Sequence, residues 1–105
     1  MAAWHAKQIE LLRPVFNMLR SVLSKDGRLV LLAPMGGTLR VEFECLDFSE
    51  ISRVYVADIN VKCAEVLHKD ARLAGKLTYE VGDIAQYAFE ELVGAVDLVS
   101  CCYFA

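Results

Sequence analysis

Two aspartates stand where apolar segments of the chain end, and their spacing points to a shared ligand. Asp58 follows the run Val54 to Ala57, and Asp83 follows the run Leu77 to Val81 and one glycine, Gly82. If both runs are strands of one parallel sheet, their carboxyl ends lie at the edge where open α/β sheets bind nucleotides. A carboxylate there can accept hydrogen bonds from ribose hydroxyls or from an exocyclic amine. The pair therefore predicts an adenosine-containing cofactor more firmly than it predicts a reaction.

Each aspartate has an alternative role as the N-cap of the helix that follows it, where a carboxylate oxygen accepts a backbone N–H. Asn60 could take that role in place of Asp58, which would leave the Asp58 carboxylate for a ligand. One bound ligand would account for both acids at adjacent strand ends, whereas two helix caps would be two unrelated features. The predicted cofactor contacts at these strand ends are Asp58, Ile59, Asp83 and Ile84.

The glycine-containing turn Ala33-Pro34-Met35-Gly36-Gly37 has the position of a cofactor-binding loop after a strand. Glycines let the backbone approach a ligand closely and let the next helix present its free N–H groups. Asp58 lies about 20 residues further on, the separation at which an acid meets the ribose in doubly wound nucleotide folds. The dinucleotide fingerprint GxGxxG is absent, so a turn that needs glycine only for its backbone geometry is the alternative. The predicted cofactor contacts in this turn are Ala33, Met35, Gly36 and Gly37.

Hydrophobic spacing predicts the elements that must position these residues. Apolar residues at alternating spacings of three and four predict a helix from about Ala3 to Ser24, with Pro14 kinking it or marking a restart. A second helix, from near Asn60 to Gly75, has one apolar and one charged face. Strands are predicted at Arg28 to Ala33, Val54 to Ala57, Leu77 to Val81 and Val96 to Tyr103, and a short helix at Ala85 to Val93.

The stretch Thr38 to Cys45 fits two structures. Its strict polar and apolar alternation is typical of a half-exposed strand, hairpinned onto the first strand in a mixed sheet. As a helix capped by Thr38, it would place Leu39, Phe43 and Leu46 on one face. Parallel pairing of the flanking strands requires a crossover connection, which favours the helix.

The element order predicts a single Rossmann-like α/β domain over residues 1–105, with an N-terminal helix in 1–26 and alternating strands and helices in 27–105. We expect a three-layer fold in which flanking helices cover a sheet of about four mainly parallel strands. The net charge of −3 leaves no basic stripe, so there is no signal for nucleic-acid or membrane binding.

The four cysteines form no CxxC pair or zinc-spaced cluster, which predicts reduced, mostly buried thiols and no metal site. The sequence begins without a secretory signal pattern and has no apolar run of membrane-spanning length. A cytoplasmic location is the expectation. No side chain stands out as a catalytic base or nucleophile, so the catalytic residues stay unassigned.

The arrangement of Asp58 after the second strand, Gly82-Asp83 after the third and Val96-Asp97-Leu98-Val99 at the fourth resembles a known family. It is similar to the N-terminal cofactor-binding half of the Rossmann-type (class I) S-adenosylmethionine-dependent methyltransferases. In that family the first acid holds the ribose diol, the second contacts the adenine amine, and the fourth strand passes beneath the methyl donor. The resemblance implies an S-adenosylmethionine cofactor and, if the domain is active, methyl transfer to an unidentified acceptor.

Three departures from the family open an alternative. The turn lacks the family's spaced glycines and acidic residue, and Ser100-Cys101-Cys102-Tyr103 replaces the Asn-Pro-Pro-Tyr type of signature. The chain also ends where the family fold continues through three more strands, so we expect a truncated fold. Its last strand, Val96 to Ala105, would then be an exposed edge that invites a homodimer or a partner subunit. The alternative is a non-catalytic interaction or oligomerisation module; a nicotinamide-dinucleotide domain ranks third because it leaves Asp83 unexplained.

Overall fold

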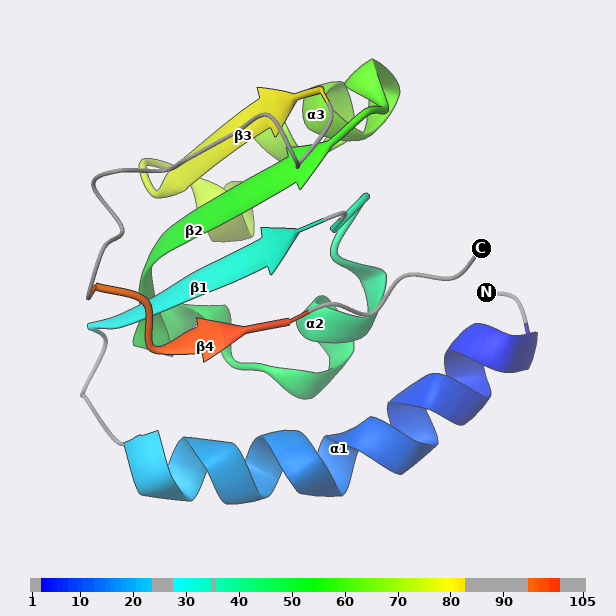
Figure 1. The fold of residues 1–105 in the computed structure, drawn as a ribbon, viewed down its shortest axis with the longest axis vertical. Coiled ribbons are helices and arrows are strands. Elements are labelled where there is room, and N and C mark those ends of the chain that lie inside the picture. Colours follow the sequence, from blue (N-terminus) through cyan, green and yellow to red (C-terminus); the bar gives the residue numbers. More distant parts are fainter. Residues whose placement is uncertain (1–2, 24–27, 35, 83–94, 101–105) are drawn as a thin grey trace.

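Four parallel strands form one sheet in the computed structural model, which describes residues 3–23, 28–34, 36–82 and 95–100. The strand order is β3-β2-β1-β4, so the chain crosses over between sequential strands (Figure 1). The predicted Rossmann-like α/β class is confirmed. The strands are β1 (Leu29–Pro34), β2 (Ile51–Asp58), β3 (Leu77–Val81) and β4 (Leu98–Val99).

The described helices between the first three strands cover one face of the sheet and lie behind it in Figure 1. They share one apolar cluster with buried residues of β1 and β2, such as Leu31, Val54 and Val56. These short helices would not be stable alone, and burial of helix and strand side chains in a common core stabilises them. The elements are α1 (Ala3–Leu23), α2 (Arg40–Cys45), the 3-10 turn η1 (Phe48–Glu50), α3 (Val61–His68) and the 3-10 turn η2 (Ala71–Leu73).

The ambiguous stretch is a helix, α2, and the sheet is not mixed. Val41 and Glu42 are adjacent and both 2% exposed, which the alternating faces of a half-exposed strand would not allow. The expected cap is wrong in detail: the N-cap position is Leu39, in a left-handed conformation, and no side chain caps the helix there. Complete burial of the Leu39 side chain accounts for this choice, because it anchors the start of α2 in the core.

The helix after β2 is shorter than its apolar spacing predicts. Asn60 caps α3, accepting a hydrogen bond from the N–H of Lys62, and α3 ends at His68 instead of continuing to Gly75. The Asp70 carboxylate accepts the backbone N–H of Arg72 and starts the separate turn η2. A local side-chain bond of this kind competes with continued helix, so the face pattern alone placed the helix end too far along the chain.

Helix α1 lies at the edge of the molecule beside β4 and α2, and Figure 1 shows it bent along its length. The bend fits an internal proline, Pro14, which removes one hydrogen bond of the helix. Ile9 and Phe16 are buried against Val41 of α2, with Leu98 of β4 packed on the same cluster. This confirms the predicted apolar stripe and shows which elements it covers.

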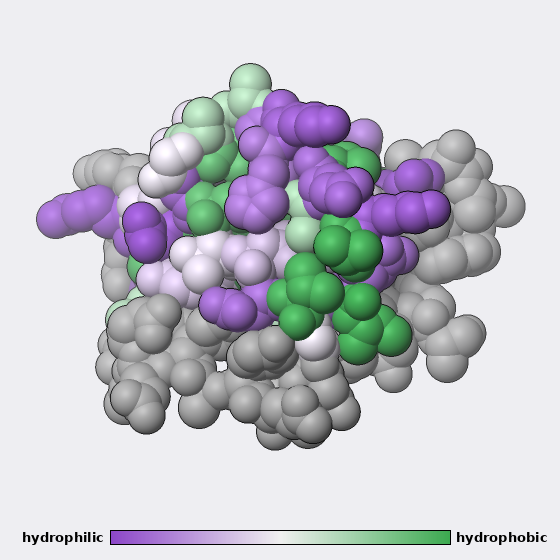
Figure 2. Space-filling view, turned by 90° about the horizontal axis from the view of Figure 1, so that it is seen from above, coloured by the Kyte–Doolittle hydropathy of each residue, from purple (hydrophilic) through white to green (hydrophobic). Residues whose placement is uncertain are grey.

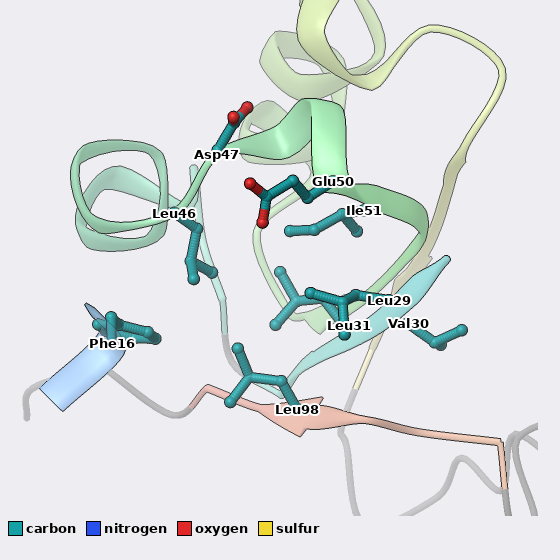
Figure 3. Close-up of a pocket in the computed structure, with 9 residues that line it drawn as sticks. All are labelled: Phe16, Leu29, Val30, Leu31, Leu46, Asp47, Glu50, Ile51 and Leu98. Atoms are coloured by element: carbon teal, nitrogen blue, oxygen red, sulfur yellow. The ribbon is translucent and has the colours of Figure 1, made fainter. Parts of the chain in front are cut away.

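The amino-terminal edge of the sheet is closed by apolar packing and by two charged side chains. Figure 3 shows Phe16, Leu31, Leu46 and Leu98 around a narrow apolar crevice at this edge. The Lys76 ammonium donates to the carbonyl oxygens of Phe48 and Ile51 at 2.8 and 2.9 Å. The Asp97 carboxylate accepts the backbone N–H of Val30 at 2.8 Å. These two charged side chains therefore serve the backbone.

Three predictions fall wholly or partly on residues outside those described. They are the helix Ala85 to Val93, the position of Asp83, and the part of the last strand beyond Ser100. Within the described part, β4 is an outer strand of the sheet, shorter than predicted, with Val99 56% exposed. Pairing through the Val96 to Ala105 strand therefore stays a proposal. Among the described helices, none has the length and hydrophobicity needed to cross a membrane.

Candidate functional site

The glycine turn after β1 is shaped by close packing and by positive backbone angles. A β-carbon on Gly36 would lie 2.8 Å from the carbonyl oxygen of Ala33 and 3.1 Å from Cγ1 of Val56. Gly37 has a φ angle of 57°, in the left-handed region that glycine adopts without strain. Gly36 is therefore required by the packing of the turn, which is the geometric alternative considered from the sequence.

Asp58 ties the end of β2 to this turn. Its Oδ2 accepts the backbone N–H of Gly37 at 2.9 Å, and its Oδ1 accepts the backbone N–H of Asn60 at 3.0 Å. Because Asn60 itself caps α3, the Asp58 carboxylate is not used as the helix cap. The acid predicted from sequence thus lies in direct contact with the predicted glycine turn, and it is half-buried.

Tyr79 holds the same glycine from the next strand. Its hydroxyl donates to the carbonyl oxygen of Gly37 at 3.2 Å, so the two sides of the Gly37 residue bond to β2 and β3. Burial and the nearby Asp58 carboxylate raise the pKa of the Tyr79 hydroxyl, which therefore stays a hydrogen-bond donor at neutral pH. The sequence reasoning missed Tyr79. The available signal was its position two residues before the end of a strand that neighbours the Asp58 strand.

Exposed apolar side chains lie next to Asp58. Ile59 is 78% exposed, and Val81, which pairs with Asp58 in the β2–β3 register, is 41% exposed. Figure 2 looks down on the α3 and β3 side and shows apolar side chains together, among hydrophilic ones, toward the end at which these strands finish. This edge of the sheet thus combines a carboxylate with open apolar surface, a pairing suited to a ligand that is polar on one side and flat and apolar on the other.

A buried acid that the sequence reasoning did not consider lies at the carboxyl end of β4. Glu42 is 2% exposed, and the hydroxyl of Ser100, just after β4, donates to its Oε2 at 2.8 Å. Burial raises the pKa of Glu42, against the smaller lowering effects of its own backbone N–H and of Ser100. The pair joins α2, which follows the glycine turn, to the end of β4.

The described thiols offer no activated nucleophile. Burial raises the pKa of both Cys45 and Cys63, and the Asp58 carboxylate adds to this at Cys63. A raised pKa keeps a thiol protonated at neutral pH and weakly reactive. Cys101 and Cys102 lie outside the described residues. Within the described ranges no group of His, Cys, Asp and Glu side chains is arranged to hold a metal ion.

Comparison with known proteins bears on the fold. No protein family matches the sequence, and no curated protein does either. Among solved structures, the chain is similar to the crystal structure of a putative RNA methyltransferase from Pyrococcus horikoshii, with a TM-score of 0.55 and 18% identity. The fold is methyltransferase-like. The match covers 72% of this chain and 37% of the methyltransferase chain, so the present chain spans much less than that protein's length.

Within this methyltransferase-like fold, the predicted cofactor contacts divide into three groups. Gly37 and Asp58 are joined by a hydrogen bond, and Ile59 lies exposed beside them. Ala33 and Gly36 pack against each other in the turn: Ala33 is fully buried, backbone included, so it offers no accessible surface to a ligand. Met35, Asp83 and Ile84 lie outside the described residues.

Proposed function

We propose that the chain is an S-adenosylmethionine-binding, methyltransferase-like domain, with Asp58 as the ribose ligand. The observation that carries the proposal is the bond between Asp58 and the glycine turn, because it puts an acid and a side-chain-free backbone segment in contact at the carboxyl edge of the sheet. The methyltransferase-like fold supports the same cofactor class. The methyl acceptor stays open.

The donor and acceptor chemistry of Asp58 fits a ribose diol. An ionised carboxylate offers about four lone-pair positions. Backbone N–H groups of Gly37 and Asn60 use one position on each oxygen, which leaves each oxygen able to accept one more hydrogen bond. Two neighbouring ribose hydroxyls are matched donors for two neighbouring oxygens. Asp58 is half-buried, so its carboxylate is held in place by the backbone and still accessible.

The adenine ring would take the apolar surface beside this acid. Ile59 and Val81 expose large fractions of their side chains to solvent, and covering such surface with a flat ring is favourable at about 25 cal/mol per Å². Asp83, two residues beyond Val81 in the chain, is the proposed partner of the adenine amine. The glycine turn would lie against the methionine part of the cofactor.

S-adenosylmethionine, when bound, supplies a methyl group activated for transfer to a nucleophile. The residues of this chain contribute orientation: Asp58 and Tyr79 bond from two strands to the N–H and the C=O of Gly37, which holds the turn in one geometry before a ligand arrives. Holding two reactants in line accounts for much of the rate gain in such a transfer. We assign no catalytic base.

Calorimetric titration with S-adenosylhomocysteine tests the proposal, with NADH as the control ligand. We expect binding of S-adenosylhomocysteine to the wild type and at least a tenfold loss of affinity in Asp58→Ala, because the ribose loses both acceptors. Asp58→Asn separates charge from shape, since the amide keeps one acceptor oxygen. The matched control is Asp70→Ala, which removes an acid that also accepts a backbone N–H but lies on the η2 turn.

Two results would overturn the assignment. Absence of binding at millimolar S-adenosylhomocysteine to folded wild-type protein would remove the cofactor, and equal affinity of wild type and Asp58→Ala would remove the role of Asp58. Circular dichroism of each variant establishes that lost binding is not lost folding. NADH binding that depends on Asp58 would favour a dinucleotide site instead.

A second candidate function, a non-catalytic interaction module, is favoured by a separate observation. Large apolar side chains of α1 face solvent, among them Leu11 at 62% and Val22 at 77% exposure. Such surface serves contact with another protein and has no role in holding a nucleotide at the other side of the fold. The two functions are compatible, since one uses the sheet edge and the other the outer face of α1.

A further inference from the structure

Helix α1 is apolar on two sides. One side carries Ile9 and Phe16 into the protein core, as expected from the sequence. The other side is a solvent-exposed row of large apolar residues that the sequence reasoning did not separate from the first, and we call it the α1 outer stripe. Its members are Leu11 (62% exposed), Val15 (42%), Met18 (61%) and Val22 (77%).

The α1 outer stripe has the spacing of a helix-pairing seam. Successive members are four, three and four residues apart, the 4-3-4 alternation of positions a and d in a coiled-coil heptad. Val15 and Val22 take the a positions, and Leu11 and Met18 take the d positions. No charged residue interrupts the stripe. On its solvent flank the Lys7 ammonium and the Glu10 carboxylate pair with each other at 3.7 Å, so covering the stripe would leave neither charge buried without a partner.

We propose that the α1 outer stripe pairs with the same stripe of a second copy of this chain, the two helices running antiparallel about a two-fold axis between Val15 and Met18. Antiparallel pairing sets each a position against a d position of the partner helix. Leu11 then faces Val22, and Val15 faces Met18, so every layer combines one compact and one longer side chain. A two-fold contact closes on itself, and a seam that is complementary to its own reverse is what such a contact needs.

The position of α1 permits this pairing. It lies along the margin of the molecule, with the described elements on its other side (Figure 1). Twenty-one residues of helix span about 31 Å at 1.5 Å per residue, and the seam from Leu11 to Val22 takes up about 17 Å of that length, mostly on the carboxyl side of Pro14. Two copies could therefore meet along α1 with the sheets on opposite sides of the pair.

The size of the stripe sets the expected strength. Its exposed apolar area is on the order of 400 Å² per copy, within the range of the largest patch on an ordinary monomer. Two such stripes bury less than the roughly 1,200 Å² at which stable interfaces begin. We therefore expect a weak, reversible dimer whose population rises with protein concentration. It is independent of the proposed cofactor site.

Sedimentation velocity of the full chain between 2 and 200 µM tests the dimer. The wild type should shift from monomer toward dimer over this range, and Val22→Glu should stay monomeric because a charge would be buried in the seam. Ser21→Glu, next to it in sequence but off the stripe, is the matched control and should dimerise like wild type. Val99→Glu places the same charge on the exposed edge strand β4 and should also leave the dimer intact.

A crosslinking experiment tests the antiparallel arrangement. The double variant Val15→Cys with Met18→Cys should give a covalent dimer under mild oxidation, since these positions face each other across the two-fold axis. Leu11→Cys should not, because two Leu11 positions would lie about 16 Å apart along the antiparallel helices, beyond the reach of a disulfide. Wild type provides the background from its native cysteines.

The proposal fails under any of three outcomes. A monomer at 200 µM would mean that a different partner, or none, covers the α1 outer stripe. A dimer that survives Val22→Glu but is lost in Val99→Glu would move the interface to the β4 edge. Efficient crosslinking of Leu11→Cys would make the helices parallel.

Discussion

At both edges of the sheet, polar side chains form hydrogen bonds to backbone groups, but the consequences of these bonds differ. At the amino-terminal edge, the Lys76 ammonium donates to the carbonyl oxygens of Phe48 and Ile51. At the carboxyl edge, Asp58 and Tyr79 bond to the N–H and the C=O of Gly37. In both places a polar side chain fixes the backbone of a neighbouring segment: Lys76 does so from the turn before β3, and Asp58 and Tyr79 do so from β2 and β3.

The surroundings separate the two edges. Around Lys76 none of the bonded residues has a positive φ angle: Ile51 lines the narrow apolar crevice (Figure 3), and Phe48 and Lys76 line a more open hollow. Around Asp58 the fixed backbone has positive φ angles at Gly37 and Leu39, and the apolar side chain of Ile59 is left open to solvent. The comparison teaches that a structural bond becomes part of a candidate site when it holds an unusual backbone next to accessible surface. Four substitutions test this distinction.

Gly36→Ala should have the largest effect. The new β-carbon would lie 2.8 Å from the Ala33 carbonyl oxygen, a backbone atom that cannot move aside cheaply. We expect a loss of about 3 kcal/mol in unfolding free energy, and loss of S-adenosylhomocysteine binding in the molecules that remain folded. Urea denaturation measures the first effect and calorimetry the second.

The control for that change is Gly75→Ala, where a β-carbon meets nothing within 4 Å but φ is 76°. It isolates the cost of the backbone angle, about 1 kcal/mol. Gly36 has no left-handed φ angle, so a loss at Gly36 no larger than that at Gly75 would mean that its contact with the Ala33 carbonyl oxygen costs no more than one strained backbone angle.

Lys76→Met should come next and should act on stability alone. It leaves the partly buried carbonyl oxygens of Phe48 and Ile51 without their donor, at a cost of about 2 kcal/mol. Affinity for S-adenosylhomocysteine should stay within about twofold of wild type, because the altered edge is opposite the site. A large loss of affinity in the folded variant would contradict the division between the two edges.

Glu42→Gln should change the dependence of stability on pH. Burial raises the folded-state pKa of Glu42 above its ordinary value near 4.5. The stabilisation that comes from its protonated form is complete below that ordinary value and is lost as pH rises through the raised pKa. The variant, which cannot ionise, should therefore gain stability relative to wild type as pH increases from 4 to 8. Urea midpoints that fall in parallel for the two proteins would argue against a raised pKa.

Tyr79→Phe should have the smallest effect. It removes only the hydroxyl that bonds to the Gly37 carbonyl, worth about 1 kcal/mol or less in stability. Because that bond helps to fix the turn, we expect S-adenosylhomocysteine affinity to fall about threefold. The control is Tyr55→Phe, on the strand next to it. An affinity loss of the same size in both variants would take Tyr79 out of the site.

Much of the fold could be predicted because it depends on local patterns. An uninterrupted apolar run marks β1 to within a residue or so, the run Leu77 to Val81 marks β3, and the 3.6-residue spacing marks α1. The predicted helix boundaries are wrong where side chains bond to nearby backbone, as at Asp70, where a new turn begins and the helical region ends early. Periodicity carries no information about such bonds.

The sequence by itself determined the strand-end acid, the glycine turn and the parallel order that brings them to one edge. Only the tertiary structure decided that Asp58 bonds to the Gly37 N–H, that Tyr79 bonds to the Gly37 carbonyl oxygen, and that Glu42 is buried against Ser100. It also decided that a second row of apolar side chains on α1, from Leu11 to Val22, faces outward. The physical reason is that spacing along a chain defines which face a residue occupies, whereas the partner on that face comes from a segment many residues away.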